Sequence, residues 1–296
     1  MPRFKEYMDV QSRILSFFIY LCSLLPFWLL YVLSDILYLA LYYIVGYRRE
    51  VVSTNLKKSF PDKSQDELVE VEKKFYHFLA DLIVENIKMT SMSVNESKKR
   101  LKLLNKDVVL NYLDRKQPVI LVTGHYANWE WGIHALSLMS SYPSLIVYKP
   151  LTNKVFEKVY NKIRERFGAI MVPMKQTLRK ILEFQNQSHT SVFLADQTPL
   201  RSESKHFISF LNQPTLIYLG IEKIAKKLNY PIIYCHIDRI KRGYYTCEFT
   251  NLVDKPAECP DNQITDIHSV FLEKIIQKKP ELWLWSHKRW KHKPHA

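Results

Sequence analysis

The chain has 296 residues, 47% of them hydrophobic, and a net charge of +14. This hydrophobic content can bury a sizeable core. Because there are only 6 glycines and no low-complexity tract or internal repeat, a disordered, linker-rich or solenoid architecture is excluded. We expect one compact unit whose positive charge meets a polyanion: a nucleic acid, an anionic membrane surface or a phosphorylated substrate.

The N-terminal region is apolar enough to predict a membrane anchor. Residues 14–34 carry no charged side chain, and residues 36–47 continue the apolar pattern after Asp35. A bilayer span needs about 20 apolar residues, so the first run is long enough. A cleaved signal peptide is excluded, because its apolar core has about 7 to 15 residues and ends at a small-residue cleavage site. We expect residues 1–47 to form the anchor and residues 48–296 a second domain; a pair of apolar core helices is the alternative.

The flanking charges leave the orientation of this anchor open. Basic residues precede and follow it, so the positive-inside rule favours neither side. Its aromatic residues suit the interfacial level of a bilayer, whether the segment spans the bilayer or lies partly embedded. The flanking basic residues are Arg3, Lys5 and Arg13 on one side and Arg48, Arg49, Lys57 and Lys58 on the other.

Helices come next along the chain, followed by alternating strands and helices. Residues 59–89 begin with a proline turn and a serine cap and continue with apolar residues spaced three and four apart, as in an amphipathic helix. Short apolar runs follow at residues 118–124, 144–150, 190–197 and 230–237. Such strands, separated by helices, predict a mostly parallel sheet covered by helices, an α/β sandwich and not a barrel.

Polar residues follow three of these predicted strands directly. His125, Lys149 and Asp196 stand where the first, second and third strands end. Ligand sites of open α/β sheets lie at the carboxyl ends of the strands. We therefore expect these side chains to converge on one cleft.

His125 and Glu130, in the stretch GHYANWEWG, are the candidate catalytic pair. The spacing alone is common: His268 and Glu273 repeat it inside a helical pattern, where five residues separate the side chains by about 140°. His125 differs because it follows a strand and Gly124, so Glu130 can reach back from the first turn of the next helix. We expect the Glu130 carboxylate to fix the imidazole in one tautomer and make it a general base. A structural histidine with a surface glutamate nearby is the alternative.

Several blocks, taken in order, resemble one family. They are GHYANWEWG, YKPLTNK, IRERFG, ADQ and WLWSHKRWKHKP, and with the N-terminal anchor and NLKKSFPDKS they cover nearly the whole chain. They resemble the bacterial lipid A biosynthesis acyltransferases, the late or secondary enzymes of the lauroyl and myristoyl type, in the version seen in Bacteroidetes-type bacteria. Many members have a phenylalanine-glycine pair where this chain has Leu211 and Asn212, so the loop geometry there, and with it the acceptor or acyl-length preference, is open.

The resemblance implies a glycerolipid-acyltransferase-like fold and a specific reaction. The family moves a fatty acyl chain from acyl carrier protein, or sometimes coenzyme A, to a hydroxyl of a 3-hydroxyacyl chain on a phosphorylated glucosamine disaccharide. It works at the cytoplasmic face of the inner membrane. His125 and Glu130 match its histidine-x4-acid dyad. Arg164 matches an arginine near the active site, and Asp196 matches a conserved aspartate. The expected partners are acyl carrier protein, a lipid A precursor and membrane lipids, and no nucleic acid.

Acyl transfer from a thioester needs a base, a donor for the developing oxyanion and room for an apolar chain. Arg164, or amides at the helix start after Gly124, are the expected oxyanion donors, and we expect Asp196 to position Arg164 by a salt bridge. Ordinary core packing is the favoured interpretation of Trp129 and Trp131, with an acyl tunnel as the alternative. No metal and no redox cofactor is expected, because the four cysteines (Cys22, Cys235, Cys247 and Cys259) match no zinc or redox motif.

Residues 149–180 hold nine basic and two acidic residues, half of the excess charge of the chain. Such a surface attracts an anionic carrier protein, lipid head groups and phosphorylated sugars. Lys149 and Arg179 are substrate-binding candidates within it, whereas a solvated helix face explains most of the other lysines. The C-terminal residues 283–294 contain three tryptophans among basic residues, which predicts an element at a membrane interface or one packed on the core.

Two rival functions stay open. The first is a membrane-anchored protein that binds polyanions without chemistry; its binding would fall steeply with salt and survive the loss of His125. The second is an acyltransferase for another membrane lipid, such as a phospholipid, an ornithine-type lipid or another glycolipid.

Overall fold

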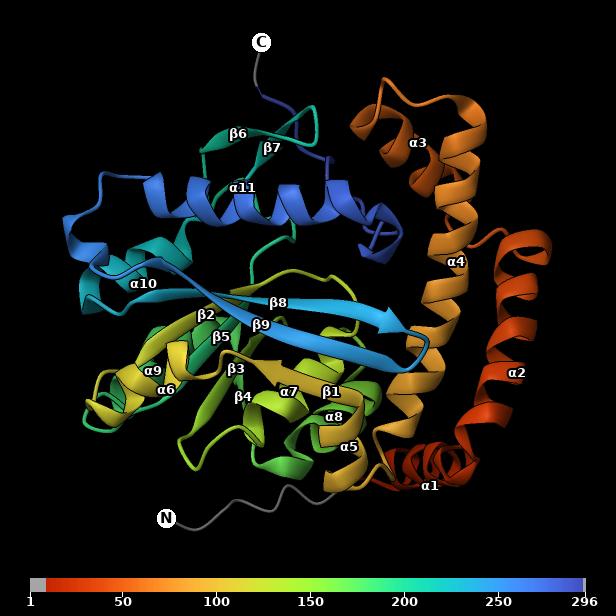
Figure 1. Cartoon of the computed structure of the whole chain (residues 1–296), viewed down its shortest axis with the longest axis horizontal. Helices are drawn as coiled ribbons and strands as arrows, with labels where there is room; N and C mark the ends of the chain where they lie inside the picture. Colours follow the sequence, from red (N-terminus) through yellow and green to blue (C-terminus); the bar gives the residue numbers. More distant parts are fainter. Residues whose placement is uncertain (1–8, 295–296) are drawn as a thin grey trace.

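The structure, a computed structural model, describes residues 9–294 (Figure 1). Arg3 and Lys5, which bear on the orientation of the anchor, lie outside the described residues. A twisted sheet lies at the centre with helices on both of its sides. This arrangement confirms the α/β class.

The main sheet has seven strands in the order β1-β9-β8-β2-β5-β3-β4. All neighbours from β8 to β4 pair in parallel, whereas β9 runs antiparallel to β8, and β1 pairs in parallel with β9. The predicted strands correspond to β2, β3, β5 and β8; the others go beyond the sequence prediction. The bounds are β1 Leu101–Leu104, β2 Val119–Thr123, β3 Ser144–Tyr148, β4 Ile170–Pro173, β5 Thr190–Leu194, β8 Ile232–Lys241 and β9 Tyr244–Val253.

Helices cover both faces of this sheet. In the view of Figure 1, α10 and α11 lie above the sheet, and α5, α7 and α8 lie below it. The bounds are α5 Val94–Arg100, α6 Asp107–Asp114, α7 Trp129–Ser137, α8 Lys154–Arg164, α9 Thr177–Glu183, α10 Gly220–Leu228 and α11 Gln263–Lys278.

The predicted amphipathic helix is α4 (Gln65–Lys88). Ser64 and Glu67 form a capping box at its start, which satisfies two backbone N–H groups that the helix cannot pair internally. Asp81 and Glu85 are also buried on this helix, which its apolar spacing does not predict. The predicted apolar positions face the core, with Leu68, Phe75, Phe78, Leu79 and Leu82 buried and Val71 partly buried.

The apolar N-terminal region forms two helices. α1 (Val10–Leu24) ends ahead of Pro26, and α2 (Phe27–Leu39) begins after it and continues as the π-helix η1 (Ala40–Ile44). A single span over residues 14–34 is therefore not formed, because proline lacks the N–H that a continuous helix needs. Among residues 9–294, Phe27–Ile44 is the one helix long and apolar enough to cross a membrane, which is consistent with an anchor.

α2 lies lengthwise against α4, and α3 (Arg49–Ser59) connects the two (Figure 1). Ser34 Oγ on α2 donates to Asp81 Oδ1 on α4 at 2.7 Å. The other side of α1 and α2 exposes large apolar side chains, among them Phe17, Trp28 and Ile36, each more than half exposed. Exposed apolar surface of this extent marks an interaction site in soluble proteins. The predicted domain boundary after residue 47 stays a prediction.

The C-terminal segment packs on the core. It begins with the 3-10 helix η5 (Pro280–Leu282), and both Trp283 and Trp285 are buried. For these two tryptophans the core-packing alternative is therefore correct. Trp290 is partly buried, and its indole donates to Thr215 Oγ1 at 2.7 Å.

Leu211 and Asn212, where the sequence departs from the family pattern, form the turn between β6 (Phe207–Phe210) and β7 (Gln213–Leu216). Their φ angles are +50° and +58°, as a two-residue hairpin turn requires. Glu273 Oε1 accepts the backbone N–H of Leu211 at 2.8 Å. Glu273 thus serves this hairpin, and in the described part of the chain no hydrogen bond or ion pair joins it to His268.

Candidate active site

His125 lies in the turn between β2 and α7, residues 124–128, which we call the catalytic turn. A Cβ atom at Gly124 would lie 2.9 Å from Leu272 Cδ1 and 3.4 Å from Asp196 Oδ2, so a larger residue here would push on the side chains that surround the turn. Asn128 ends the turn as the N-cap of α7, and its Oδ1 accepts the backbone N–H of Trp131 at 3.0 Å. The sequence therefore folds here as a strand, a tight turn and a capped helix.

The end of η5 and the residues that follow it hold the catalytic turn in place. Ala127 has a φ of +49°, which is uncommon for a residue with a Cβ atom. Its backbone N–H donates to the carbonyl of Leu282 at 2.9 Å, and the N–H of Leu284 donates to the carbonyl of His125 at 3.1 Å. These bonds fix the turn in an otherwise unfavourable conformation.

Asp196 is the partner of His125. Its Oδ1 lies 2.6 Å from His125 Nδ1, and its Oδ2 accepts the backbone N–H of His125 and the indole N–H of Trp283, both at 2.8 Å. Burial alone would raise the pKa of Asp196, but His125 and these hydrogen bonds outweigh it and hold that pKa well below its usual 3.8. Asp196 is therefore a carboxylate at neutral pH.

The hydrogen bonds of His125 assign its tautomer. A carboxylate at Nδ1 requires a proton on that nitrogen, so Nε2 is left as the acceptor. The side-chain amide nitrogen of Gln197 lies 3.1 Å from Nε2 and can donate to it. In this state His125 can take a proton at Nε2, and Asp196 stabilises the resulting imidazolium.

Glu130 has a different partner from the predicted one. Arg164 donates its Nε to Glu130 Oε2 at 2.8 Å and its second terminal nitrogen to Oε1 at 2.5 Å. Among the described residues no hydrogen bond joins Glu130 to His125; Trp129 lies between them. The Trp129 ring centre is 5.0 Å from that of His125, and its indole donates to Glu130 Oε1 at 3.0 Å. The predicted Glu130–His125 and Asp196–Arg164 contacts are therefore wrong, because the two acids have exchanged partners.

The order of strands explains this exchange. β5 pairs in parallel with β2, and Leu194 lies opposite Thr123, so the residues just beyond each strand end meet. Asp196 thus reaches His125. Glu130, on the first turn of α7, instead contacts the last residue of α8, Arg164.

Arg164 keeps its positive charge although it is largely buried. Burial acts to lower the pKa of Arg164. The charge of Glu130 and the hydrogen bonds to it act more strongly in the opposite direction, so the pKa lies above the usual 12.5. The Tyr160 ring lies 4.4 Å from the guanidinium carbon and adds a cation–π contact. A guanidinium has five N–H donors, so its bonds with Glu130 leave others free to bind substrate or an oxyanion.

Gln197, Trp283 and Arg289 complete the site, and sequence reasoning did not single them out as site residues. Arg289 is 2% exposed, and with Asp196 and His268 it lines a cavity of about 10 Å³. Burial lowers the pKa of Arg289 to about 10, so it is charged at neutral pH and favours the charged form of Asp196. The sequence feature that could have indicated Gln197, Trp283 and Arg289 is their position in the ADQ and WLWSHKRW blocks.

The two other predicted substrate-binding residues lie at the protein surface. Lys149 and Arg179 are exposed, and Arg179 bonds Gln176 and Glu183 of its own helical region. Their role in substrate binding stays a prediction. Trp131 is 1% exposed, so core packing accounts for it.

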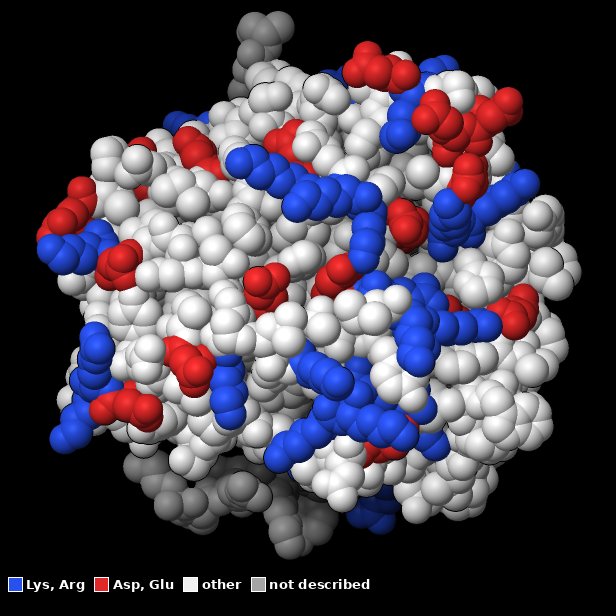
Figure 2. Space-filling model, viewed as in Figure 1, with Lys and Arg blue, Asp and Glu red and all other residues white. Residues whose placement is uncertain are grey.

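The positive charge is spread more widely than the sequence suggested. On the face shown in Figure 2, basic side chains gather over α5, β1 and the turn between β8 and β9. In the predicted segment, the basic residues that form ion pairs with described residues include Lys154, Lys158, Arg164, Arg179 and Lys180. The segment 149–180 is thus less positive in effect than its composition implies.

No group of three or more His, Cys, Asp and Glu side chains suited to a metal ion occurs within the part of the chain that the structure describes. The four cysteines are free. The expectation of a reaction without metal or redox cofactor stays a prediction.

Comparison with known proteins places these features in a family. Residues 2–292 match the family described as bacterial lipid A biosynthesis acyltransferase. The chain is 26% identical to a lipid A biosynthesis acyltransferase of Haemophilus influenzae, over 84% of this chain and 80% of that protein. It is 22% identical to the lipid A biosynthesis palmitoleoyltransferase of Escherichia coli, over 83% of this chain and 80% of that protein.

Proposed function

Because the chain belongs to the bacterial lipid A biosynthesis acyltransferases, and so is an acyltransferase of lipid A biosynthesis, we propose that His125 is its general base. The acyl donor is acyl carrier protein or coenzyme A, and the acceptor is a hydroxyl of a lipid A precursor. The observation that carries this assignment is the His125–Asp196 pair, which leaves Nε2 free to accept a proton. Neither rival function is needed, since the family consists of enzymes of lipid A biosynthesis.

The reaction follows from the tautomer of His125. The acceptor hydroxyl displaces the Gln197 amide and gives its proton to Nε2, while its oxygen bonds to the thioester carbonyl carbon. When the tetrahedral intermediate collapses, the carbon–sulfur bond breaks and the thiolate takes the proton back from His125. Asp196 stays ionised throughout and stabilises the imidazolium.

Glu130 acts through Arg164 in this proposal. Two hydrogen bonds hold the guanidinium in one plane, and its remaining donors stabilise the oxyanion of the intermediate. Trp129, between the two polar pairs, fixes the distance from the base to the cation. Glu130 is thus a positioning residue in place of the predicted partner of the histidine.

We further propose that α1 and the exposed side of α2 embed in the cytoplasmic face of the inner membrane. A spanning α2 would draw α4 into the bilayer, because α2 is tied to α4 by Ser34 and Asp81. The basic surface over α5 and the β8–β9 turn lies beside these helices in Figures 1 and 2. It would face anionic lipid head groups.

The test is a gain of mass on the acceptor. Membranes that contain wild type or His125→Ala are incubated with acyl carrier protein loaded with fatty acids of several lengths and a tetra-acylated lipid A precursor. We expect one added acyl chain with wild type only. The matched control is His206→Ala, which removes a histidine paired with Asp266 at 2.8 Å outside the site, and should keep full activity.

Each other outcome has a definite meaning. Equal gain with His125→Ala removes His125 from the mechanism. No gain with folded wild type on any chain length contradicts the proposed acceptor, and acyl coenzyme A in parallel reactions distinguishes the donors.

A further inference from the structure

Asn128 stands at the joint between the catalytic turn and α7. It is fully buried; its Oδ1 caps the helix at Trp131, and its Nδ2 donates to Glu85 Oε2 at 2.7 Å. Only one end of an amide can donate, so these two bonds fix its orientation. As the N-cap, Asn128 sets the direction of α7 and with it the positions of Trp129 and Glu130.

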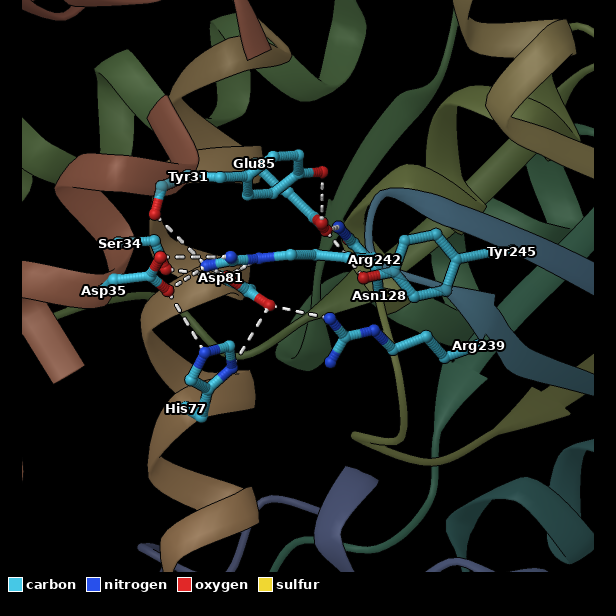
Figure 3. A network of polar contacts seen from close by, with 10 residues as sticks. All are labelled: Tyr31, Ser34, Asp35, His77, Asp81, Glu85, Asn128, Arg239, Arg242 and Tyr245. Atoms are coloured by element: carbon cyan, nitrogen blue, oxygen red, sulfur yellow. Dashed lines mark hydrogen bonds and ion pairs between the residues drawn. The ribbon is translucent and has the colours of Figure 1, made fainter. Parts of the chain in front are cut away.

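Glu85 is the acceptor at the centre of a buried network (Figure 3). Besides Asn128, it accepts the hydroxyl of Tyr31 at 3.0 Å and that of Tyr245 at 2.7 Å. Its backbone carbonyl accepts the indole of Trp131 at 3.1 Å. These donors come from α2, β9 and the start of α7, so Glu85 joins three elements to α4.

A second cluster in the same network differs in its charges. Asp81 accepts Arg239 at 2.7 Å and Arg242 at 2.6 Å, so its buried charge is balanced by two cations. Among the described residues, Glu85 has only neutral hydrogen-bond donors. A buried carboxylate without a bonded cation is costly, and an apolar side chain would fill the space more cheaply. The hydrogen bond that Glu85 accepts from Asn128 is a role that an apolar side chain could not fill.

We propose that Glu85 is a positioning residue for the reaction: it holds Asn128, so that the catalytic turn presents His125 and α7 presents Glu130 in their working places. The proposal rests on the role of His125 proposed above. Ala127, strained at a positive φ, lies next to Asn128, so a loose cap would let this part of the turn relax.

The donor and the acceptor of the Glu85–Asn128 hydrogen bond can be exchanged by mutation. This exchange distinguishes a positioning role of the pair from simple packing. Asn and Asp cap helices about equally well, so Asn128→Asp keeps the cap and changes only the contact with Glu85, where two carboxyl groups then meet. Glu85→Gln keeps an oxygen for Asn128, because the Tyr31 hydroxyl can accept from the new amide. In the double variant the amide donates to the carboxylate, and the pair is restored with donor and acceptor exchanged.

The measurement is acyl transfer with separate kcat and KM values. We expect Asn128→Asp to lower kcat about tenfold at pH 8 with KM unchanged, and less at pH 6, where the two carboxyl groups share a proton. Glu85→Gln and the double variant should stay within about threefold of wild type. Thermal unfolding of every variant is followed in parallel.

Three results would overturn the inference. They are full kcat for Asn128→Asp at pH 8, a double variant no better than Asn128→Asp, or a double variant that recovers its unfolding temperature but not its kcat. His125→Ala in the same assay keeps the two proposals apart, since its activity tests the base and not Glu85.

Discussion

The working state of His125 depends on Asp196, a residue that is remote in sequence. The carboxylate fixes the proton on Nδ1, and Trp283 and the His125 amide hold that carboxylate in place. An amide at position 196 would keep the shape but not the charge. It would also present a donor to Nδ1 and so favour the wrong tautomer.

We therefore expect Asp196→Asn to lower kcat on the order of 10⁴-fold, as in hydrolases whose histidine loses its carboxylate partner. The measurement is the rate of acyl transfer at saturating substrate, with circular dichroism to verify folding. Asp266→Asn, at the partner of His206, is the matched control and should be silent. A folded Asp196→Asn protein within tenfold of wild type would contradict the assignment.

Glu85 gives the protein a specific dependence of stability on pH. Burial raises its pKa from 4.5 to about 7, although hydrogen bonds from Tyr245 and Asn128 oppose this. Between these values the folded protein holds a proton that the unfolded chain has lost. The contribution of Glu85 to the free energy of unfolding therefore falls as the pH rises from 4.5 to 7, by about 3 kcal/mol in all.

The variant Glu85→Gln, which does not titrate, should lack this decrease in the free energy of unfolding. Buried histidines oppose it in wild type: burial lowers the pKa of His134, His268 and His287 to about 4, so their contribution to stability rises with pH over the same range. The informative quantity is thus the difference between variant and wild type, measured by denaturant unfolding in detergent. We expect the variant to gain up to about 3 kcal/mol on wild type between pH 5 and pH 8. A difference that does not change with pH would argue against a titrating Glu85.

Residues of the site differ in how far sequence predicts them. His125 was predictable because a strand, a glycine and a helix start form a local pattern. Its partner was not, because the choice between Glu130 and Asp196 depends on which strand lies next to β2. Trp283 and Arg289 were harder still, since their own surroundings predict an interface or a packed core equally well.

Among the elements, α7 packs very closely against the sheet at Gly132. A Cβ atom at Gly132 would lie 2.5 Å from Ile237 Cδ1 of β8. Glycine therefore lets the helix approach the sheet closely. The usual penalty of glycine inside a helix is offset by that contact.

Gly132→Ala should destabilise the protein by about 1 to 3 kcal/mol, as expected for overpacking of a core. Ile237→Val removes the obstructing methyl group, so the double variant should recover most of the loss. Chemical denaturation of both variants and of Ile237→Val alone gives the coupling free energy between the two positions. Strictly additive losses would mean that the two side chains do not compete for this space.

The elements that sequence predicts are those with one clear pattern. β2, β3, β5 and β8 lie inside the sheet and read as continuous apolar runs, and α4 has both a capping box and an apolar stripe. β9 alternates buried and accessible residues toward one edge, and β4 is a short edge strand that ends in Pro173. The break between α1 and α2 follows from Pro26, which weighs more than the apolar length around it.

At the scale of the whole molecule, one side is apolar and the neighbouring surface is basic. Phe17 on α1 is 57% exposed, and burying such a ring in a bilayer interface contributes about 1.5 to 3 kcal/mol. A charge at this position would have to stay hydrated. Membrane affinity should therefore depend on this side far more than on apolar residues elsewhere.

Phe17→Asp should lower binding to vesicles of zwitterionic and anionic phospholipid at least tenfold, measured by co-sedimentation. Val270→Asp, on α11, alters a residue that is 44% exposed on another part of the surface and should leave binding unchanged. Equal losses for both variants would contradict a docking surface formed by α1 and α2. Binding that survives in both would indicate that the charged surface alone suffices.

The catalytic turn is held by Leu282, Trp283 and Leu284, near the C-terminal end of the described chain. The site can therefore form only late in synthesis. These three residues leave the ribosome after His125, Glu130, Arg164, Asp196 and Gln197, whereas α1 and α2 leave it early. Folding begins during synthesis, so the apolar helices can meet the bilayer while the turn still lacks its last support. With α1 and α2 docked as proposed, the protein would reach the membrane before it can act, and translation that stops ahead of Trp283 would yield a bound but inactive protein.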